Sequence, residues 1–149
     1  MFTRHFNTLF ASVTVAAALA GCATPPANLD LALEKPSASG RYAVALVPPP
    51  VTPAINQVHS WTVRLTNASG TPVTGAMVTV GGGMPQHGHG FPTRPRVTRE
   101  VEDGTYLVEG VKFNMPGWWD IKFDIHGAEG EDKVTFNTVV TRASHNQSP

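Results

Sequence analysis

Two histidines separated by a single glycine stand in a Gly- and Pro-rich stretch, residues 84–92, which reads MPQHGHGFP. Where the chain is extended, His87 and His89 would point to the same side, because side chains at i and i+2 share one face of a strand. Two imidazoles on one side can bind one ion, and imidazole suits copper, zinc and nickel. Met84 lies just before them, and its thioether is a soft ligand that favours Cu(I). The stretch therefore predicts a candidate copper site.

A second stretch, residues 114–120 (NMPGWWD), repeats the Met-Pro pair and adds two tryptophans. The β-rich segment between the two stretches turns at Asp103-Gly104, a dipeptide typical of tight hairpins. The loops that flank this hairpin should therefore emerge together, at the end of the domain opposite the turn. Met115 could then bring a second thioether to the two histidines.

The same residues also allow an interpretation without metal. His87 and His89 could hydrogen-bond to backbone carbonyls and hold the loop in shape, while Met84 and Met115 fill gaps in the core. One of the two tryptophans should pack in the core, and the other could cover the loop or contact a partner. Support for the loops is expected from Pro85, Pro116, Trp118 and Trp119. The sequence leaves both interpretations open.

Catalysis is not expected. A copper oxygenase would need an open coordination position and a substrate cleft, and the sequence indicates neither. No arrangement of serine, histidine and an acid stands out, so the prediction is a protein that is not an enzyme and has no catalytic residues.

Residues 1–21 predict a secretory signal peptide. An apolar run over residues 9–20 follows Arg4, and it is shorter than the ~20 residues that a membrane-spanning helix needs. The run ends in LAGC, residues 19–22, which resembles the lipobox of bacterial lipoproteins. That resemblance implies cleavage just before Cys22 and a lipid on its thiol.

The segments that flank the folded domain are expected to be polar or flexible. Residues 22–39 are rich in proline, alanine and serine and predict a flexible tether, and residues 143–149 predict a polar tail. Ala23, not an aspartate, would be the second mature residue. By resemblance to Gram-negative lipoproteins, this favours the outer membrane, facing the periplasm. Cys22 is the chain's one cysteine, which excludes intrachain disulfides.

Strand patterns dominate residues 40–142, which should form one domain. Short segments of alternating apolar and polar residues are separated by turn residues, and no helical period of useful length appears. This pattern predicts an all-β fold, an immunoglobulin-like antiparallel β-sandwich of about seven strands. The expected strands are 41–47, 59–67, 73–80, 96–102, 105–113, 118–125 and 133–140. The expected inward residues include Trp61, Val63, Leu65, Trp119, Ile121, Phe123 and Ile125, with Asp120, Lys122 and Asp124 outside.

The charges of the chain are balanced, with 11 Lys and Arg against 11 Asp and Glu. No basic patch is visible in the sequence, so nucleic acid is excluded as a partner. The partners expected instead are a membrane, through a lipid on Cys22, and an envelope protein.

Residues 75–125 resemble the YtkA-like domain, a bacterial extracytoplasmic family related to FixH-like proteins. The resemblance rests on a strand followed by Met-Pro-x-His-x-His-Gly (84–90), a hairpin, and Met-Pro-Gly-x-Trp (115–119). It implies a β-sandwich associated with the cell envelope. FixH relatives are tied to the assembly of copper-containing respiratory oxidases, but they are anchored by a transmembrane helix, whereas this chain has a lipobox-like sequence.

Overall fold

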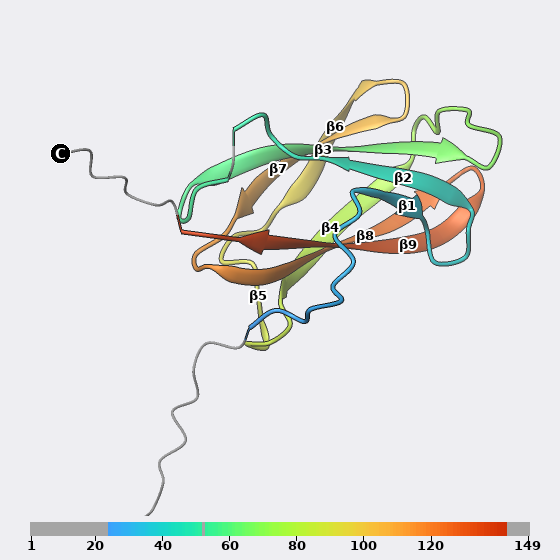
Figure 1. The fold of residues 1–149 in the computed structure, drawn as a ribbon. Coiled ribbons are helices and arrows are strands. Elements are labelled where there is room, and N and C mark those ends of the chain that lie inside the picture. The colour runs from blue at the N-terminus through green and yellow to red at the C-terminus, as the bar shows by residue number, and fades with distance from the viewer. Residues whose placement is uncertain (1–23, 52, 143–149) are drawn as a thin grey trace, which may run out of the picture.

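The computed structural model describes residues 24–51 and 53–142, which form nine β-strands in two antiparallel sheets (Figure 1). The strands are β1 (Glu34–Pro36), β2 (Tyr42–Val47), β3 (Val58–Asn67), β4 (Met77–Met84), β5 (His89–Gly90), β6 (Arg96–Glu102), β7 (Thr105–Lys112), β8 (Gly117–Gly127) and β9 (Gly130–Val140). One sheet has the order β1-β2-β3-β7-β6 and the other the order β5-β4-β8-β9. The predicted immunoglobulin-like β-sandwich is confirmed. Each of the seven expected strands has a counterpart, although the one expected at 73–80 is shifted to Met77–Met84, and β1 and β5 are additional.

The core lies between the sheets and follows the alternation of the strands. Trp61, Val63 and Leu65 of β3 are buried, and so are Trp119, Ile121, Phe123 and Ile125 of β8. Burial of a large apolar side chain contributes roughly 1.5–3 kcal/mol. Both tryptophans that could anchor the sheets, Trp61 and Trp119, are therefore core residues.

The N-terminal segment is more ordered than the sequence predicted. Residues 34–36, placed in a flexible tether spanning 22–39, pair with β2, and Ser37 is only 3% exposed. The Ser37 hydroxyl donates to the Asp132 carboxylate, which also accepts the backbone N–H of Ser39. These bonds explain why a segment without apolar periodicity can pack. The domain thus begins before residue 40, whereas the predicted signal peptide, Cys22 and the tail 143–149 lie outside the described residues.

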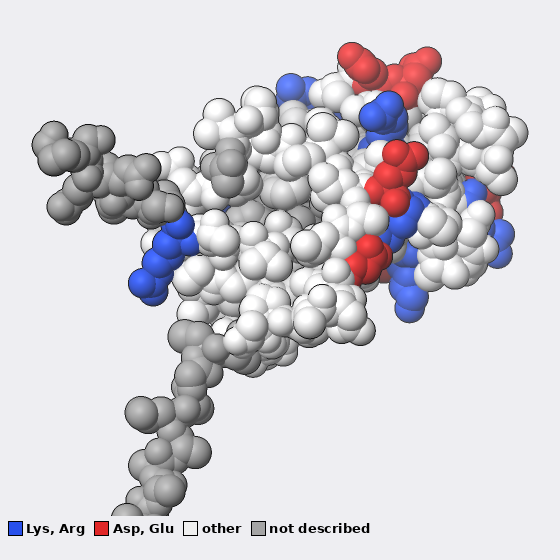
Figure 2. All heavy atoms as spheres, viewed as in Figure 1, with Lys and Arg blue, Asp and Glu red and all other residues white. Residues whose placement is uncertain are grey.

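The two ends of the sandwich differ in charge. We call the "His-loop end" the one formed by the β2–β3, β4–β5 and β7–β8 loops (48–57, 85–88 and 113–116), and none of these loops contains Asp, Glu, Lys or Arg. The charged residues beside them, Arg94 before β6 and Arg142 after β9, are cations. At the opposite end, the β6–β7 and β8–β9 hairpins carry Arg99, Glu100, Glu102, Asp103, Glu129, Glu131, Asp132 and Lys133. Figure 2 shows most charges on the right and upper part of the view, and a mostly uncharged surface with a cationic side chain at the lower left.

Phe123 provides a test of the core. Its side chain is fully buried and lies edge-on to Phe136, with ring centroids 6.2 Å apart. We expect Phe123→Ala to lower the free energy of unfolding by about 3–5 kcal/mol, a large part of the ~5–15 kcal/mol typical of a domain. Chemical denaturation measures this. Thr135→Ala, at an exposed site on β9, is the matched control, and equal stability of the two variants would contradict the inward placement of Phe123.

Candidate functional site

The two histidines lie on a small hairpin formed by β4 and β5. Met84 pairs directly with His89 and Gly83 with Gly90, and residues 85–88 form the turn between them. The backbone N–H groups of His87 and Gly88 both donate to the Met84 carbonyl, at 3.0 Å each. His87 is thus in a turn, not in the extended chain that was considered for both histidines.

The turn nevertheless brings the two imidazoles together. The ring centroids of His87 and His89 are 6.0 Å apart, with 32° between the ring planes, and both residues are exposed. Because a metal–imidazole nitrogen distance is about 2.0–2.1 Å for zinc, two imidazoles that share an ion have centroids roughly 5–6.5 Å apart. The observed separation falls in that range.

A hydrogen bond determines which nitrogen of the neutral His89 ring carries the hydrogen. His89 Nδ1 lies 3.0 Å from the carbonyl oxygen of Gly90, and because that oxygen can only accept, Nδ1 carries the hydrogen. In a neutral ring, the lone pair is then on Nε2, the nitrogen directed away from this bond. Metal-binding histidines commonly have such a bond on the nitrogen that does not bind the metal.

Trp119 connects the His loop to the Met115 loop. His89 lies edge-on to the indole, with centroids 5.8 Å apart, and Phe91 stacks on it at 5.6 Å. The indole Nε1 donates to the carbonyl oxygen of Met115 at 3.1 Å. The expectation that both Met-Pro loops emerge at the same end is confirmed. Trp118 lies on the other face of β8 and donates to the Asn137 side chain at 2.9 Å.

The methionines lie beneath the hairpin. Met84 is only 1% exposed and belongs to the core, and a Cβ atom on Gly117 would lie 2.8 Å from its Cε atom. The Met84 methyl group therefore packs against the residue that follows Pro116. Met115 is half-buried and packs against the same core. The burial of Met84 fits the gap-filling interpretation, and its pairing with His89 puts these two side chains on the same face of the hairpin.

Within residues 24–51 and 53–142, no group of three or more His, Cys, Asp and Glu side chains could hold a metal. A site at this hairpin would therefore rest on two imidazoles and on thioethers. Such a donor set is unsuited to the hard cations Ca²⁺ and Mg²⁺, which take oxygen ligands, and suits Cu(I).

A buried carboxylate beside the hairpin was not predicted. Asp120 was expected outside, with Lys122 and Asp124, but it is 6% exposed. Its Oδ1 accepts the backbone N–H of Gly83 at 2.8 Å, and Lys122 Nζ lies 2.8 Å from Oδ2. Asp120 lies on the predicted face of β8, but the prediction that it is exposed was wrong. It is buried because the glycines of β4 let the backbone come close to its carboxylate. Three consecutive glycines, 81–83, were the signal for that close approach.

Comparison with known proteins assigns the family. The YtkA-like family model matches residues 37–124, more than half of the chain. The chain belongs to the YtkA-like family. His87, His89, Met84 and Met115 all lie inside the matched region, whereas Cys22 lies before it.

Solved structures similar to this YtkA-like domain include two with low sequence identity. The filamin domain of Lin-41 has 16% identity and a TM-score of 0.43, covering 62% of this chain and 88% of that one. The C-terminal domain of ZirS has 13% identity and a TM-score of 0.43, covering 83% and 86%. No curated protein matches the sequence. In the described part of the chain, no helix is long and apolar enough to cross a bilayer.

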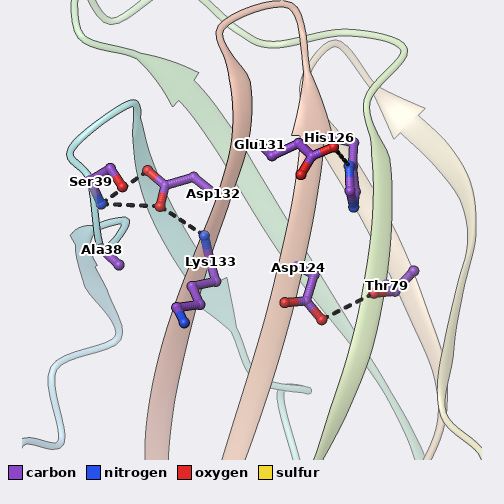
Figure 3. Close-up of a pocket in the computed structure, with 8 residues that line it drawn as sticks. All are labelled: Ala38, Ser39, Thr79, Asp124, His126, Glu131, Asp132 and Lys133. Atoms are coloured by element: carbon purple, nitrogen blue, oxygen red, sulfur yellow. Dashed lines mark hydrogen bonds and ion pairs between the residues drawn. The ribbon is translucent and has the colours of Figure 1, made fainter.

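A second hollow of the YtkA-like domain lies near the opposite end, on strands β4, β8 and β9 (Figure 3). Its acidic side chains already have partners: Asp124 with Thr79 at 3.5 Å, and Glu131 with His126 at 3.2 Å. Burial alone would raise the pKa of Asp132, but hydrogen bonds from the Ser37 hydroxyl and from the backbone N–H groups of Lys133, Ser39 and Arg41 lower this pKa well below its usual value. Asp132 thus holds the N-terminal turn at this hollow, which is a structural role.

The glycines of β4 give a test of the hairpin geometry. Gly82 has a φ of 136°, and a Cβ there would collide with the Asp120 carbonyl and meet the Phe91 ring. Gly81 has ordinary φ, and a Cβ there meets nothing within 4 Å. We expect Gly82→Ala to displace the hairpin and lower the melting temperature, and Gly81→Ala to leave both unchanged. Thermal unfolding and the NMR shifts of the Trp119 indole N–H measure this, and equal effects of the two variants would contradict the close approach.

Proposed function

We propose that this YtkA-like domain belongs to a lipid-anchored envelope protein that binds copper, most favourably Cu(I), and carries it or hands it to an assembling partner. The observation that carries the proposal is the imidazole pair of the β4–β5 hairpin, with rings 6.0 Å apart. His87 and His89 are the main ligands, and Met84 and Met115 supply thioethers. The protein is a binding module and not an enzyme.

The chemistry of the donors supports this choice of ion. Imidazole nitrogen binds either oxidation state of copper, and thioether sulfur favours Cu(I). The Gly90 carbonyl holds the His89 ring by its Nδ1, which leaves Nε2 for a metal. When bound, the copper would be held at the exposed side of the hairpin, where exchange with a partner is possible.

The second candidate function is a metal-free module that contacts another envelope protein. Its support is the burial of Met84 and the packing of His89 on Trp119, since these contacts can hold the hairpin in shape without an ion. The His-loop end, whose three loops carry no charged residue, would then be the contact surface. Copper titration separates this candidate from the first.

The anchor completes the proposal. A lipid on Cys22 would attach the protein to the bacterial envelope, at the outer membrane facing the periplasm, as its sequence resemblance to lipoproteins suggests. Stable attachment takes more than one acyl chain, which a fully lipidated cysteine would provide.

Competition with a Cu(I) chelator tests the metal site. Loss of a residue that only hydrogen-bonds to a metal ligand typically weakens metal binding ~10–100-fold. Because His87 and His89 would bind the ion directly, we expect His87→Ala and His89→Ala each to weaken Cu(I) binding by more than that. Binding should also weaken in acid, because imidazole must be neutral to bind. His126→Ala, an exposed histidine at the opposite end, is the control. Equal affinities in all these proteins would contradict the site and favour the metal-free module.

Leucine substitutions separate the thioethers from their packing role. Because Met84 is buried, Met84→Leu removes the sulfur and keeps nearly the same volume. We expect Met84→Leu and Met115→Leu to weaken Cu(I) binding more than Cu(II) binding, since the sulfur ligand favours the former. Unfolding curves serve as the control for folding. A variant that binds Cu(I) as tightly as the wild type excludes its methionine as a ligand.

Fractionation of cells tests the anchor. We expect Cys22→Ser to release the protein into the soluble fraction or to leave its signal peptide uncleaved, because no lipid can be attached to the thiol. Ala23→Ser is the matched control and should remain in the membrane fraction. Processed, membrane-bound Cys22→Ser protein would show that the anchor is elsewhere.

A further inference from the structure

The segment that leads into the domain is fastened to it at several points and begins at the His loop. Gln86 Nε2, in the β4–β5 turn, donates to the carbonyl oxygen of Thr24 at 2.9 Å. Farther on, Asn137 Nδ2 of β9 donates to the Asp30 carbonyl at 2.8 Å, and the Leu46 N–H donates to the Leu33 carbonyl at 2.7 Å. Figure 1 shows this segment in blue, starting beside the β4–β5 turn and running up to β1.

These contacts limit where the anchor can be. Cys22 lies two residues before Thr24. Since an extended chain spans at most ~3.3–3.6 Å per residue, an anchor two residues before Thr24 has a reach of only about 7 Å from it. Thr24 itself is hydrogen-bonded to the residue that precedes His87. A lipid on Cys22 would therefore enter the bilayer close to the His loop and could not hold the domain at a distance.

The surface at this end suits contact with lipid. Its three loops are uncharged, whereas Arg94 and Arg142 beside them are exposed cations, whose long side chains can keep their charge in water. Eight large hydrophobic residues are exposed in the described part of the chain, and six of them lie on the N-terminal segment or at the His-loop end. These six are Leu31, Leu33, Val47, Val51, Val58 and Val139. The lower left of Figure 2, where the chain leaves the domain, is mostly uncharged and carries a cationic side chain and no acidic one.

We propose that the domain lies on the membrane through its His-loop end, so that His87 and His89 face the lipid surface and the charged hairpins face away. This inference rests on the proposed anchor at Cys22. The occupant of the surface is the bilayer itself, because the chain reaches its anchor there and most of the exposed large hydrophobic residues lie on this end or on the segment that leads to it. An ion bound at the hairpin would then be exchanged with a protein embedded in the same bilayer and not with a soluble one.

Fluorescence quenching on vesicles tests the orientation. The full lipidated protein carries one new cysteine, either Asn114→Cys in the β7–β8 loop or Asp103→Cys in the β6–β7 turn; both positions are exposed. Each is labelled with the same fluorophore and placed on phosphatidylcholine vesicles with and without a headgroup nitroxide. We expect quenching at position 114 to be several times that at position 103.

Four outcomes are distinguishable. Protein that does not co-float with vesicles overturns the anchor, and with it the orientation. Protein that co-floats but is quenched equally at both positions, or more at position 103, overturns the orientation alone and favours a protein as the occupant of the His-loop end. Gln86→Ala removes the bond to Thr24. If the difference in quenching between positions 114 and 103 is smaller in this variant, the docked N-terminal segment helps to orient the domain. An unchanged difference in this variant overturns that role of the Thr24 bond.

Discussion

The indole of Trp119 is the contact on which the His-loop end depends. It is fully buried, it packs between Phe91 and Phe113, and it touches His89 at its edge. Its N–H group is satisfied by the Met115 carbonyl, so a single side chain joins the core to both Met-Pro loops. This bond between the buried indole and a backbone carbonyl holds the β7–β8 loop against the ring. The position of the His89 imidazole follows from that packing.

The glycines of β4 are the second feature that positions the β4–β5 hairpin. Gly82 and Gly83 let the backbone of β4 approach β8 on one side and β5 on the other, at distances that a side chain would not allow. The buried Asp120 carboxylate then accepts a hydrogen bond from the Gly83 N–H. The hairpin with the histidines is thus fixed from below by an aromatic ring and from the side by a carboxylate, while its exposed face stays open.

Most of the fold could be predicted because long strands have a clear alternation. β3 and β8 each place large apolar residues on one face, and this pattern alone identifies the sandwich and its core. β1 and β5 were missed because strands of three and two residues have no measurable period. Asp120 was misplaced for another reason: alternation gives the face of a strand but not the depth at which neighbouring backbone covers it.

The site was only partly predictable for a related reason. The topology argument placed both Met-Pro loops at one end, and the structure agrees. The docking of the N-terminal segment could not be read from the sequence, because its bonds join backbone carbonyls to single side chains 62 and 107 positions away. Such contacts leave no repeating pattern, and a stretch rich in proline and alanine looks flexible whether or not it is docked.

The same segment also shields a sheet edge. β9 has 11 residues and is the outermost strand of its sheet. The backbone N–H of Ala38 donates to the Lys133 carbonyl, and the Asp30 carbonyl accepts the side chain of Asn137 farther along the same strand. An uncovered edge of this length is a template for pairing with another chain. A protein shortened to begin at residue 40 would keep its core and its histidines, yet it would offer a strand edge to every neighbouring copy, and self-association would compete with any binding measured on it.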